Sequence, residues 1–139
     1  EMSRLGVPVV AAVLGEGGSG GALALGVANR VYMLENAVYS VISPESCAAI
    51  IYRDSSRAPA AAASLKMTAP DLLKLGLIDG IVGEPDGGAH ADPDGAAEAL
   101  RETLRTALAG LRGMSAQQLI EDRYSKFRAM GSAFVTEGL

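Results

Sequence analysis

The residues best able to do chemistry lie in one short stretch, positions 15–21, where five glycines are interrupted only by Glu16 and Ser19. An apolar run at 8–14 precedes the stretch and helix-forming residues at 20–29 follow it, which predicts a strand-to-helix junction. A bare backbone there can hold a dinucleotide pyrophosphate, present a serine nucleophile, or donate N–H groups to a carbonyl oxygen. The pattern alone leaves all three alternatives open.

The dinucleotide alternative rests on a glycine fingerprint. Gly15, Gly17 and Gly20 match G-x-G-x-x-G, and Glu35 follows at the distance expected of a ribose-binding acid. A second β-rich stretch comes almost directly after Glu35, which leaves no room for the crossover helix of a parallel nucleotide-binding unit. Glu16 would also repel a pyrophosphate. Both features argue against a dinucleotide-binding module on the 15–20 loop.

The hydrolase alternative rests on a nucleophile motif. Residues 17–21 also match G-x-S-x-G around Ser19, and Asp79 and His90 follow in the chain order used by α/β-hydrolases. His90 is the only histidine, and a lone histidine in a glycine-rich turn more often makes local hydrogen bonds. Nothing in the sequence brings His90 to Ser19, so a serine hydrolase stays an alternative without positional support.

The third alternative, in which backbone N–H groups donate to a carbonyl oxygen, needs no catalytic side chain. Glycines at a strand-to-helix junction let backbone N–H groups approach a ligand oxygen, and the helix N-terminus adds positive potential. Donors of this kind lower the barrier to an oxyanion or enolate. The plainer interpretation is that these glycines only allow a helix to pack closely on a strand.

Composition limits the classes that need considering. The 139 residues are 49% hydrophobic and 20% charged, which predicts one globular domain. A net charge of −4 without a basic cluster argues against nucleic acid as a partner. The single cysteine, Cys47, can form no internal disulfide and no zinc site, and we expect a buried thiol. No apolar run reaches the ~18 residues of a membrane span, so we expect a cytoplasmic protein that does not bind a membrane.

Patterning and capping signals predict a strand, a helix and two further strands in the first third, followed mainly by helices. Ser43 and Pro44 predict a helix start, as do Asp92 with Pro93 and the capping box from Ser115 to Gln118. The predicted elements are a strand at 8–14, a helix at 20–29, strands at 30–35 and 39–43, helices at 44–52 and 58–66, a short helix ended by Gly76, a strand at 77–82, and two C-terminal helices. The first C-terminal helix carries Leu100, Leu104, Leu108 and Leu111 on one face, expected in the core or against another subunit, and the second carries Ile120, Tyr124, Phe127 and Met130 towards one side.

Three segments, "GEGGSGGALA", "YSVISPE" and "GGAH", resemble the α-subunit family of bacterial acetyl-CoA carboxylase carboxyltransferases, and the resemblance runs from Glu1 to the final "RYSKFRAMG". It implies an α/β fold of the crotonase/ClpP-like type, built of repeated β-β-α units. It further implies that this chain is the C-terminal part of one domain, with a β/α core at 1–93 and a helical extension at 94–139. The family's preceding half, with a further oxyanion loop, is expected upstream of Glu1.

The resemblance also implies an activity. Such enzymes move a carboxyl group from carboxybiotin, tethered to a separate biotin carboxyl carrier protein, to acetyl-CoA, giving malonyl-CoA for fatty-acid synthesis. The α subunit acts only with a zinc-bearing β subunit, in an α2β2 assembly. By resemblance, the N–H groups of Gly20 and Gly21 form an oxyanion hole for the biotin ureido carbonyl, and Gly17, Gly18 and Ser19 contribute to substrate binding. No metal is expected in this chain.

Several residues depart from related patterns. Ala22 and Leu23 stand where crotonase-type hydratases place a carboxylate, which argues against hydration chemistry. Within the α-subunit pattern, Gly is expected in place of Ser46, an acidic residue in place of Gly80, and Arg in place of Ala91. The absence of a basic residue at 91 removes an anion contact expected there.

The last helix carries three cations: Arg123, Lys126 and Arg128. We expect a solvated helix face, with contact to CoA phosphates or to the partner subunit as the alternative.

Overall fold

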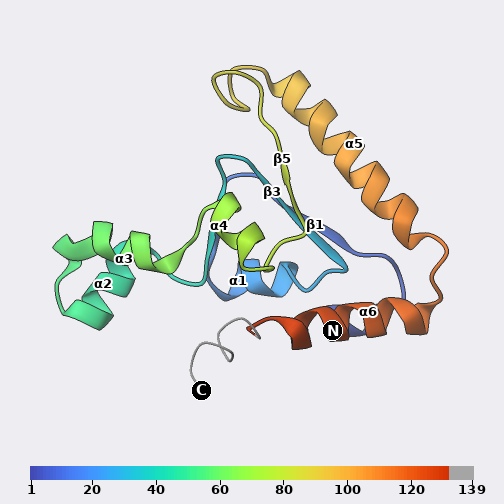
Figure 1. The fold of residues 1–139 in the computed structure, drawn as a ribbon, viewed down its shortest axis with the longest axis horizontal. Coiled ribbons are helices and arrows are strands. Elements are labelled where there is room, and N and C mark those ends of the chain that lie inside the picture. The colour runs from blue at the N-terminus through green and yellow to red at the C-terminus, as the bar shows by residue number, and fades with distance from the viewer. Residues whose placement is uncertain (132–139) are drawn as a thin grey trace.

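The computed structural model describes residues 1–131 and places two small parallel sheets at the centre of the molecule (Figure 1). The larger sheet has the order β1-β3-β5 and the smaller one pairs β2 with β4. The strands are β1 (Val10–Val13), β2 (Glu16–Gly18), β3 (Arg30–Leu34), β4 (Val38–Ser40) and β5 (Gly80–Val82).

The chain repeats one β-β-α pattern. β1 and β2 are followed by α1 (Ser19–Leu25), and β3 and β4 are followed by further helices. Each repeat puts its first strand in the larger sheet and its second in the smaller one, with Val10 paired to Arg30 and Glu16 paired to Val38. Parallel pairs need a crossover, and the intervening helices supply it. This arrangement confirms the predicted α/β fold of β-β-α units.

Several element predictions need correction. The strands predicted at 39–43 and 77–82 are shorter in the structure, at Val38–Ser40 and Gly80–Val82. Glu16–Gly18 forms strand β2, whereas the sequence predicted a strand, a helix and then two strands. Glycine is rare in strands, so propensity does not reveal β2, but a Cβ on Gly17 would lie 3.0 Å from Val13 Cγ1. A further correction is that α1 ends at Leu25 and not near Asn29, because Asn29 is fully buried under α6 (Ala116–Ala129).

The three helices with a predicted cap begin where that cap predicts. Ser43 Oγ accepts from Ser46 N at 3.2 Å at the start of α2, and Asp92 Oδ1 accepts from Gly95 N at 2.9 Å at the start of α5. Both capping-box bonds between Ser115 and Gln118 are present. The helices after α1 are α2 (Pro44–Tyr52), α3 (Ala58–Leu65), α4 (Ala69–Lys74), α5 (Pro93–Leu111) and α6, with short 3-10 turns at Met2–Arg4 and Ser55–Arg57.

The hydrophobic core surrounds β3. Val31, Met33 and Leu34 are buried, and α4 and β5 pack against them through Leu72 and Val82. The leucine stripe of α5 mostly joins the protein interior, since Leu111 is 1% exposed, Leu100 packs on the core and Leu104 is half-buried. Leu108 stays 43% exposed.

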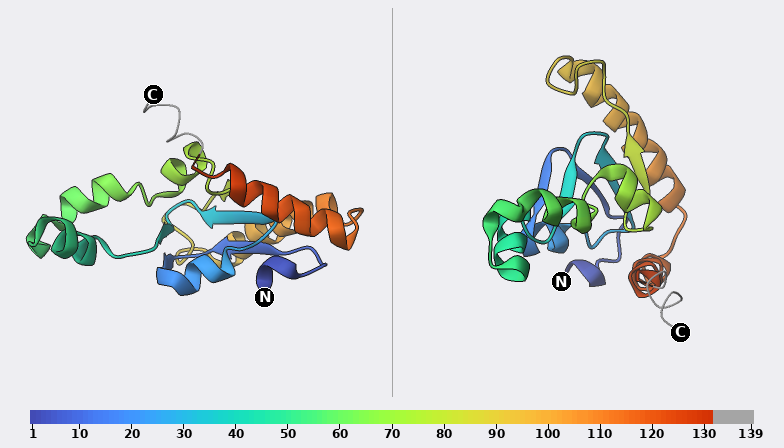
Figure 2. Two further views of the ribbon diagram at one scale, coloured as in Figure 1. Left: turned by 90° about the horizontal axis from the view of Figure 1, so that it is seen from below. Right: turned by 60° about the vertical axis from the view of Figure 1, so that its left-hand side comes forward.

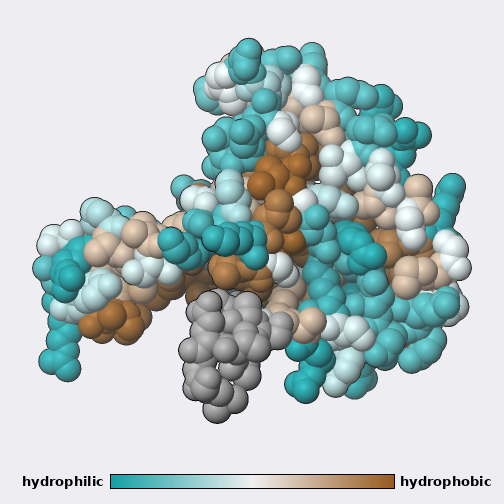
Figure 3. Space-filling view, viewed as in Figure 1, coloured by the Kyte–Doolittle hydropathy of each residue, from teal (hydrophilic) through white to brown (hydrophobic). Residues whose placement is uncertain are grey.

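The helices α2 and α3 form an arm that projects from the sheets (Figures 1 and 2). They pack on each other through the small side chains of Ala48 and Ala61. Ile50 and Ile51 are 68% and 66% exposed, and hydrophobic side chains gather along the lower edge of the arm in Figure 3. Cys47 is half-buried on α2, less enclosed than the sequence led us to expect.

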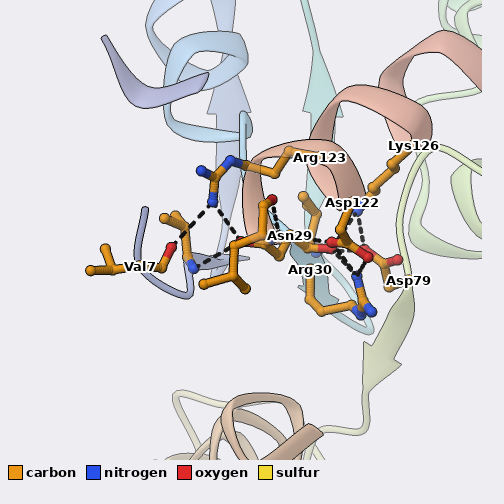
Figure 4. Close-up of polar contacts among 10 residues, drawn as sticks. Val7, Asn29, Arg30, Asp79, Asp122, Arg123 and Lys126 are labelled. Atoms are coloured by element: carbon orange, nitrogen blue, oxygen red, sulfur yellow. Dashed lines mark hydrogen bonds and ion pairs between the residues drawn. The ribbon is translucent and has the colours of Figure 1, made fainter. Parts of the chain in front are cut away.

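A buried polar network fastens α6 to the sheet (Figure 4). Asn29, 0% exposed, accepts from Val9 N and donates to Leu119 O at 2.9 Å. Arg123 donates through Nη1 to Asn29 Oδ1 at 2.6 Å and to Val7 O at 3.2 Å. Buried polar groups contribute to stability only when they are paired in this way.

The predicted solvated face of α6 is therefore wrong for Arg123, which is 1% exposed. Lys126 is also turned inwards and forms an ion pair with Asp79, and only Arg128 is exposed as predicted. The buried face of α6 also differs from the predicted one. Tyr124, predicted on the apolar face, is 60% exposed, and Leu119, which was not predicted there, is buried. The helical periodicity of hydrophobic residues could not show that Asn29, on a loop, accepts a hydrogen bond from the buried Arg123.

Candidate active site

A cavity of about 530 Å³ opens beside the glycine stretch. Its walls come from β2, the turn into α1, the end of β4 and the start of α2. Glu16 and Glu45 are the two titratable side chains that line it. Two carboxylates disfavour a phosphate ligand, so the cavity suits a neutral polar group better than a pyrophosphate.

The chain enters α1 through a sharp turn at Ser19, whose φ is +58°. A positive φ is uncommon for a residue with a side chain and marks a constrained turn. α1 begins directly at this turn, without a side-chain cap on its first N–H groups. The first-turn N–H groups of a helix have no intrahelical partner, so those of Gly20 and Gly21 are available to a ligand.

The glycines of this turn leave their backbone accessible. Gly18, Gly20 and Gly21 are exposed, and a Cβ on any of them would meet nothing within 4 Å. Packing therefore does not explain glycine at these three positions, in contrast to Gly17. Close packing accounts for glycine only at Gly17, and there the neighbours are Val13 of β1 and Tyr39 of β4 and not a helix.

A second, smaller cavity of about 190 Å³ lies on the other side of the turn. Ser19 lines both cavities, and Leu23, Tyr39 and Phe127 supply part of an apolar wall. Ser40 and Val41 also line both cavities, and the larger cavity differs from the smaller one in having Glu16 and Glu45 in its wall.

The structure does not bring the three hydrolase residues together. Asp79 accepts from Val31 N at 2.6 Å and pairs with Lys126, at the N-terminal end of β3. His90 lines a separate cavity with Glu35 and Glu84. Ser19 has the backbone of a nucleophile elbow, but no base from this set lies beside it.

The dinucleotide residues are separated as well. The middle of the G-x-G-x-x-G stretch is strand β2, paired with β4, and not a loop around a pyrophosphate. Glu35 lies in the His90 cavity, where its Oε2 accepts from Glu84 N at 3.3 Å.

Glu84 joins the loops that follow β3 and β5. Its Oε1 accepts from Asn36 N at 2.9 Å and its Oε2 from Ala89 N at 2.8 Å. These backbone hydrogen bonds, Asn36 first, stabilise the carboxylate and hold the pKa of Glu84 below its usual value.

Glu84→Gln is expected to lower the melting temperature at neutral pH. Because the folded-state pKa is lowered, the stabilisation is present above the unfolded-state pKa, about 4.3, and is lost as pH falls through the folded value. Thermal unfolding of both proteins across this range measures the effect, with Asp86→Asn in the same exposed loop as control. A gap between Glu84→Gln and wild type that persists unchanged in acid would contradict this assignment.

Comparison with known proteins decides the family. A family described as acetyl co-enzyme A carboxylase carboxyltransferase-like matches residues 1–131. The chain belongs to this family. It is 62% identical to the acetyl-coenzyme A carboxylase carboxyl transferase subunit alpha of Thermus thermophilus, covering 94% of this chain and 42% of that protein. The same subunit of Sorangium cellulosum is 61% identical, with 94% and 41% covered.

The chain thus spans about two fifths of the length of the curated carboxyltransferase α subunits it matches. Two solved structures share its fold at lower identity. A transcarboxylase 12S has a TM-score of 0.61 and 24% identity, covering 80% of this chain and 21% of that one. A Pseudomonas malonate decarboxylase hetero-tetramer in complex with coenzyme A has a TM-score of 0.65 and 23% identity, covering 95% and 51%. The crotonase-like carboxyltransferase fold is thereby confirmed.

The structure explains two of the three departures from the α-subunit pattern, those at Gly80 and Ser46. Gly80 is paired with Tyr32 across the sheet, and a Cβ on Gly80 would lie 2.9 Å from Tyr32 Cε1. The ring covers the glycine, so an acidic side chain does not fit without moving Tyr32. Ser46 adds a hydroxyl that accepts from Ser43 Oγ at 3.0 Å within the cap of α2. Ala91 is exposed, and nothing in the structure explains it.

Two further expectations concern metal ligands and membrane-spanning helices. Across residues 1–131, no three or more His, Cys, Asp and Glu side chains gather so as to hold a metal ion. In the same part of the chain, no helix is both long and apolar enough to cross a membrane.

Sequence reasoning missed Tyr39 and Gly26, which lie against α1, and Asn29, which anchors α6. A tyrosine in a β-rich stretch and a glycine after a helix have ordinary local explanations, so only their contacts reveal them.

Proposed function

We propose that this chain supplies the biotin-binding side of a carboxyltransferase that transfers a carboxyl group from carboxybiotin to acetyl-CoA, forming malonyl-CoA. The observation that carries the proposal is the open glycine turn in a chain of this family. Gly17, Gly18 and Ser19 line the cavity of about 530 Å³, and Gly20 and Gly21 follow as exposed residues at the start of α1.

The turn fits a ureido group. Biotin, carried on a separate protein, would supply the transferable carboxyl group. The N–H groups of Gly20 and Gly21 would donate to the ureido oxygen, on which negative charge gathers as the carboxyl group departs. Gly17, Gly18 and Ser19 shape the binding surface, and the constrained turn holds the donors in place before the substrate arrives. No side chain of this turn needs to gain or lose a proton.

We also propose the partner proteins, the assembly and the domain boundaries. A zinc-bearing β subunit holds the CoA thioester, a biotin carboxyl carrier protein delivers the carboxyl group, and the α and β chains form an α2β2 assembly in the cytoplasm. Residues 1–93 would form the β/α core, and α5 and α6 would belong to the extension predicted at 94–139, of which 132–139 lie outside the described residues. The subunit names of the relatives and the hetero-tetrameric structural neighbour support a hetero-oligomer.

Ser19→Gly separates this proposal from a serine nucleophile. The change removes the hydroxyl and relieves the positive φ, so the account expects carboxyl transfer within about threefold of wild type and a slightly higher melting temperature. A hydrolase nucleophile would lose at least about 10³-fold on the same change. Initial rates of the assembled enzyme and a melting curve give both readouts.

The proposal is tested by reconstitution. The full-length protein containing this chain, its β subunit, and their mixture are each assayed for malonyl-CoA decarboxylation in the presence of free biotin. Activity that requires both proteins is the expected result. A mixture without activity, or full activity in the β subunit alone, would reject the proposed function.

A further inference from the structure

The tyrosine on β4, Tyr39, lies between the glycine strand and α1. It is paired in register with Gly17 of β2, and its backbone N–H donates to Met67 O at 3.0 Å. Its ring lies so close to the neighbouring strand that a Cβ on Gly17 would come within 3.1 Å of Cδ2. The ring therefore rests directly on the backbone of β2.

The other end of the same ring reaches α1. Tyr39 Oη donates to Ala22 O over a long 3.4 Å. It also fills the space beside Gly26, where an added Cβ would overlap Oη. This contact leaves no room for a side chain at the end of α1, which accounts for Gly26. Tyr39 thus contacts the space beside two glycines: it accounts for Gly26, and together with Val13 it accounts for Gly17.

We propose that Tyr39 is a positioning residue for the Gly20 and Gly21 donors, because it sets the distance and angle between α1 and β2. The inference rests on the proposed function of those donors. α1 is short and lacks a side-chain cap, so its own hydrogen bonds fix its direction poorly. The Tyr39 ring packs between β2 and Gly26 and so fixes the direction of α1.

Two further observations suit this role. Tyr39 is half-buried and lines the smaller, apolar cavity, but it does not line the larger cavity where a substrate would bind. Burial raises the pKa of the Tyr39 hydroxyl, so it remains a donor across neutral and mildly alkaline pH. The side chain thus acts on the reaction through α1 and not by proton transfer.

The test is a double-mutant cycle in the assembled enzyme with its β subunit, read as kcat and KM for malonyl-CoA decarboxylation with biotin. Gly26→Ala forces a methyl group against Tyr39 Oη and displaces α1. The expected result is a fall in kcat of about 10- to 100-fold with KM for malonyl-CoA within about threefold, since small misplacements of reacting groups act on kcat. Tyr39→Phe removes the oxygen, so Tyr39→Phe with Gly26→Ala should recover kcat to within about threefold of Tyr39→Phe alone. Gly110→Ala, on α5 where a Cβ meets nothing within 4 Å, is the matched control.

Three results would overturn the inference: wild-type kcat in Gly26→Ala, a loss confined to KM, or no recovery in the double variant while all four proteins stay folded by circular dichroism. The last result would mean that Gly26 matters for reasons other than Tyr39. An inactive wild-type assembly would instead reject the proposed function itself, so the two failures are distinguishable.

Discussion

Gly20→Pro is expected to lower kcat for carboxyl transfer by about 10²- to 10³-fold, the usual cost of one lost oxyanion donor. Proline has no backbone N–H, and the second residue of a helix tolerates it. This chain itself places Pro59 and Pro70 at the second residue of α3 and α4, the position that Gly20 holds in α1. Ser19, which would precede the new proline, has a positive φ that the residues before Pro59 and Pro70 lack, so a melting curve of this variant must show that the fold survives while the donor is lost.

Gly20→Ala is the matched control for this prediction. It keeps the N–H group, and its Cβ meets no protein atom within 4 Å. We expect a fall of less than tenfold, measured by steady-state rates of the assembled enzyme, with a melting curve for each variant. Equal losses in the two variants would show that the space at position 20 matters and the N–H group does not.

Arg123→Met is expected to lower the free energy of unfolding by about 1–3 kcal/mol, since a buried acceptor that loses its charged donor costs roughly that much. The acceptors are Asn29 Oδ1, Val7 O and Leu5 O. Leu5 and Val7 are 40% and 56% exposed, so water can replace Arg123 at their carbonyl groups, and the buried bond to Asn29 Oδ1 carries most of the loss.

Arg128→Met provides the comparison for Arg123→Met. It removes the same side chain from the same helix at an exposed position, and should change stability by no more than about 0.5 kcal/mol. Urea denaturation of the purified proteins measures both values. Similar effects of the two substitutions would contradict the role assigned to the buried network.

The elements with strong local signals could be predicted from the sequence. The apolar runs around Val10 and Val31 became β1 and β3, and the caps at Ser43, Asp92 and Ser115 mark the starts of α2, α5 and α6. In each case the cause is local. The strands form from short apolar runs, and the helices begin at a side chain that accepts a hydrogen bond from a nearby backbone N–H. Motif resemblance added the family and with it the β-β-α topology.

The features set by distant contacts could not be predicted. β2 consists largely of glycine and exists because β4 pairs with it. Arg123 is buried because Asn29, 94 positions away, offers it an acceptor. The role of Tyr39 depends on the space left by Gly17 and Gly26, which no periodic pattern encodes.

In the proposed site, backbone N–H groups of this chain hold the ureido oxygen of biotin. The most direct test is a crystal structure of the assembled enzyme with biotin bound. The account predicts the ureido oxygen within about 3.1 Å of the backbone nitrogen atoms of Gly20 and Gly21, the usual distance of an oxyanion-hole donor. A ureido group bound instead in the cavity of Glu35 and His90, or held only by side chains of the partner subunit, would contradict the claim.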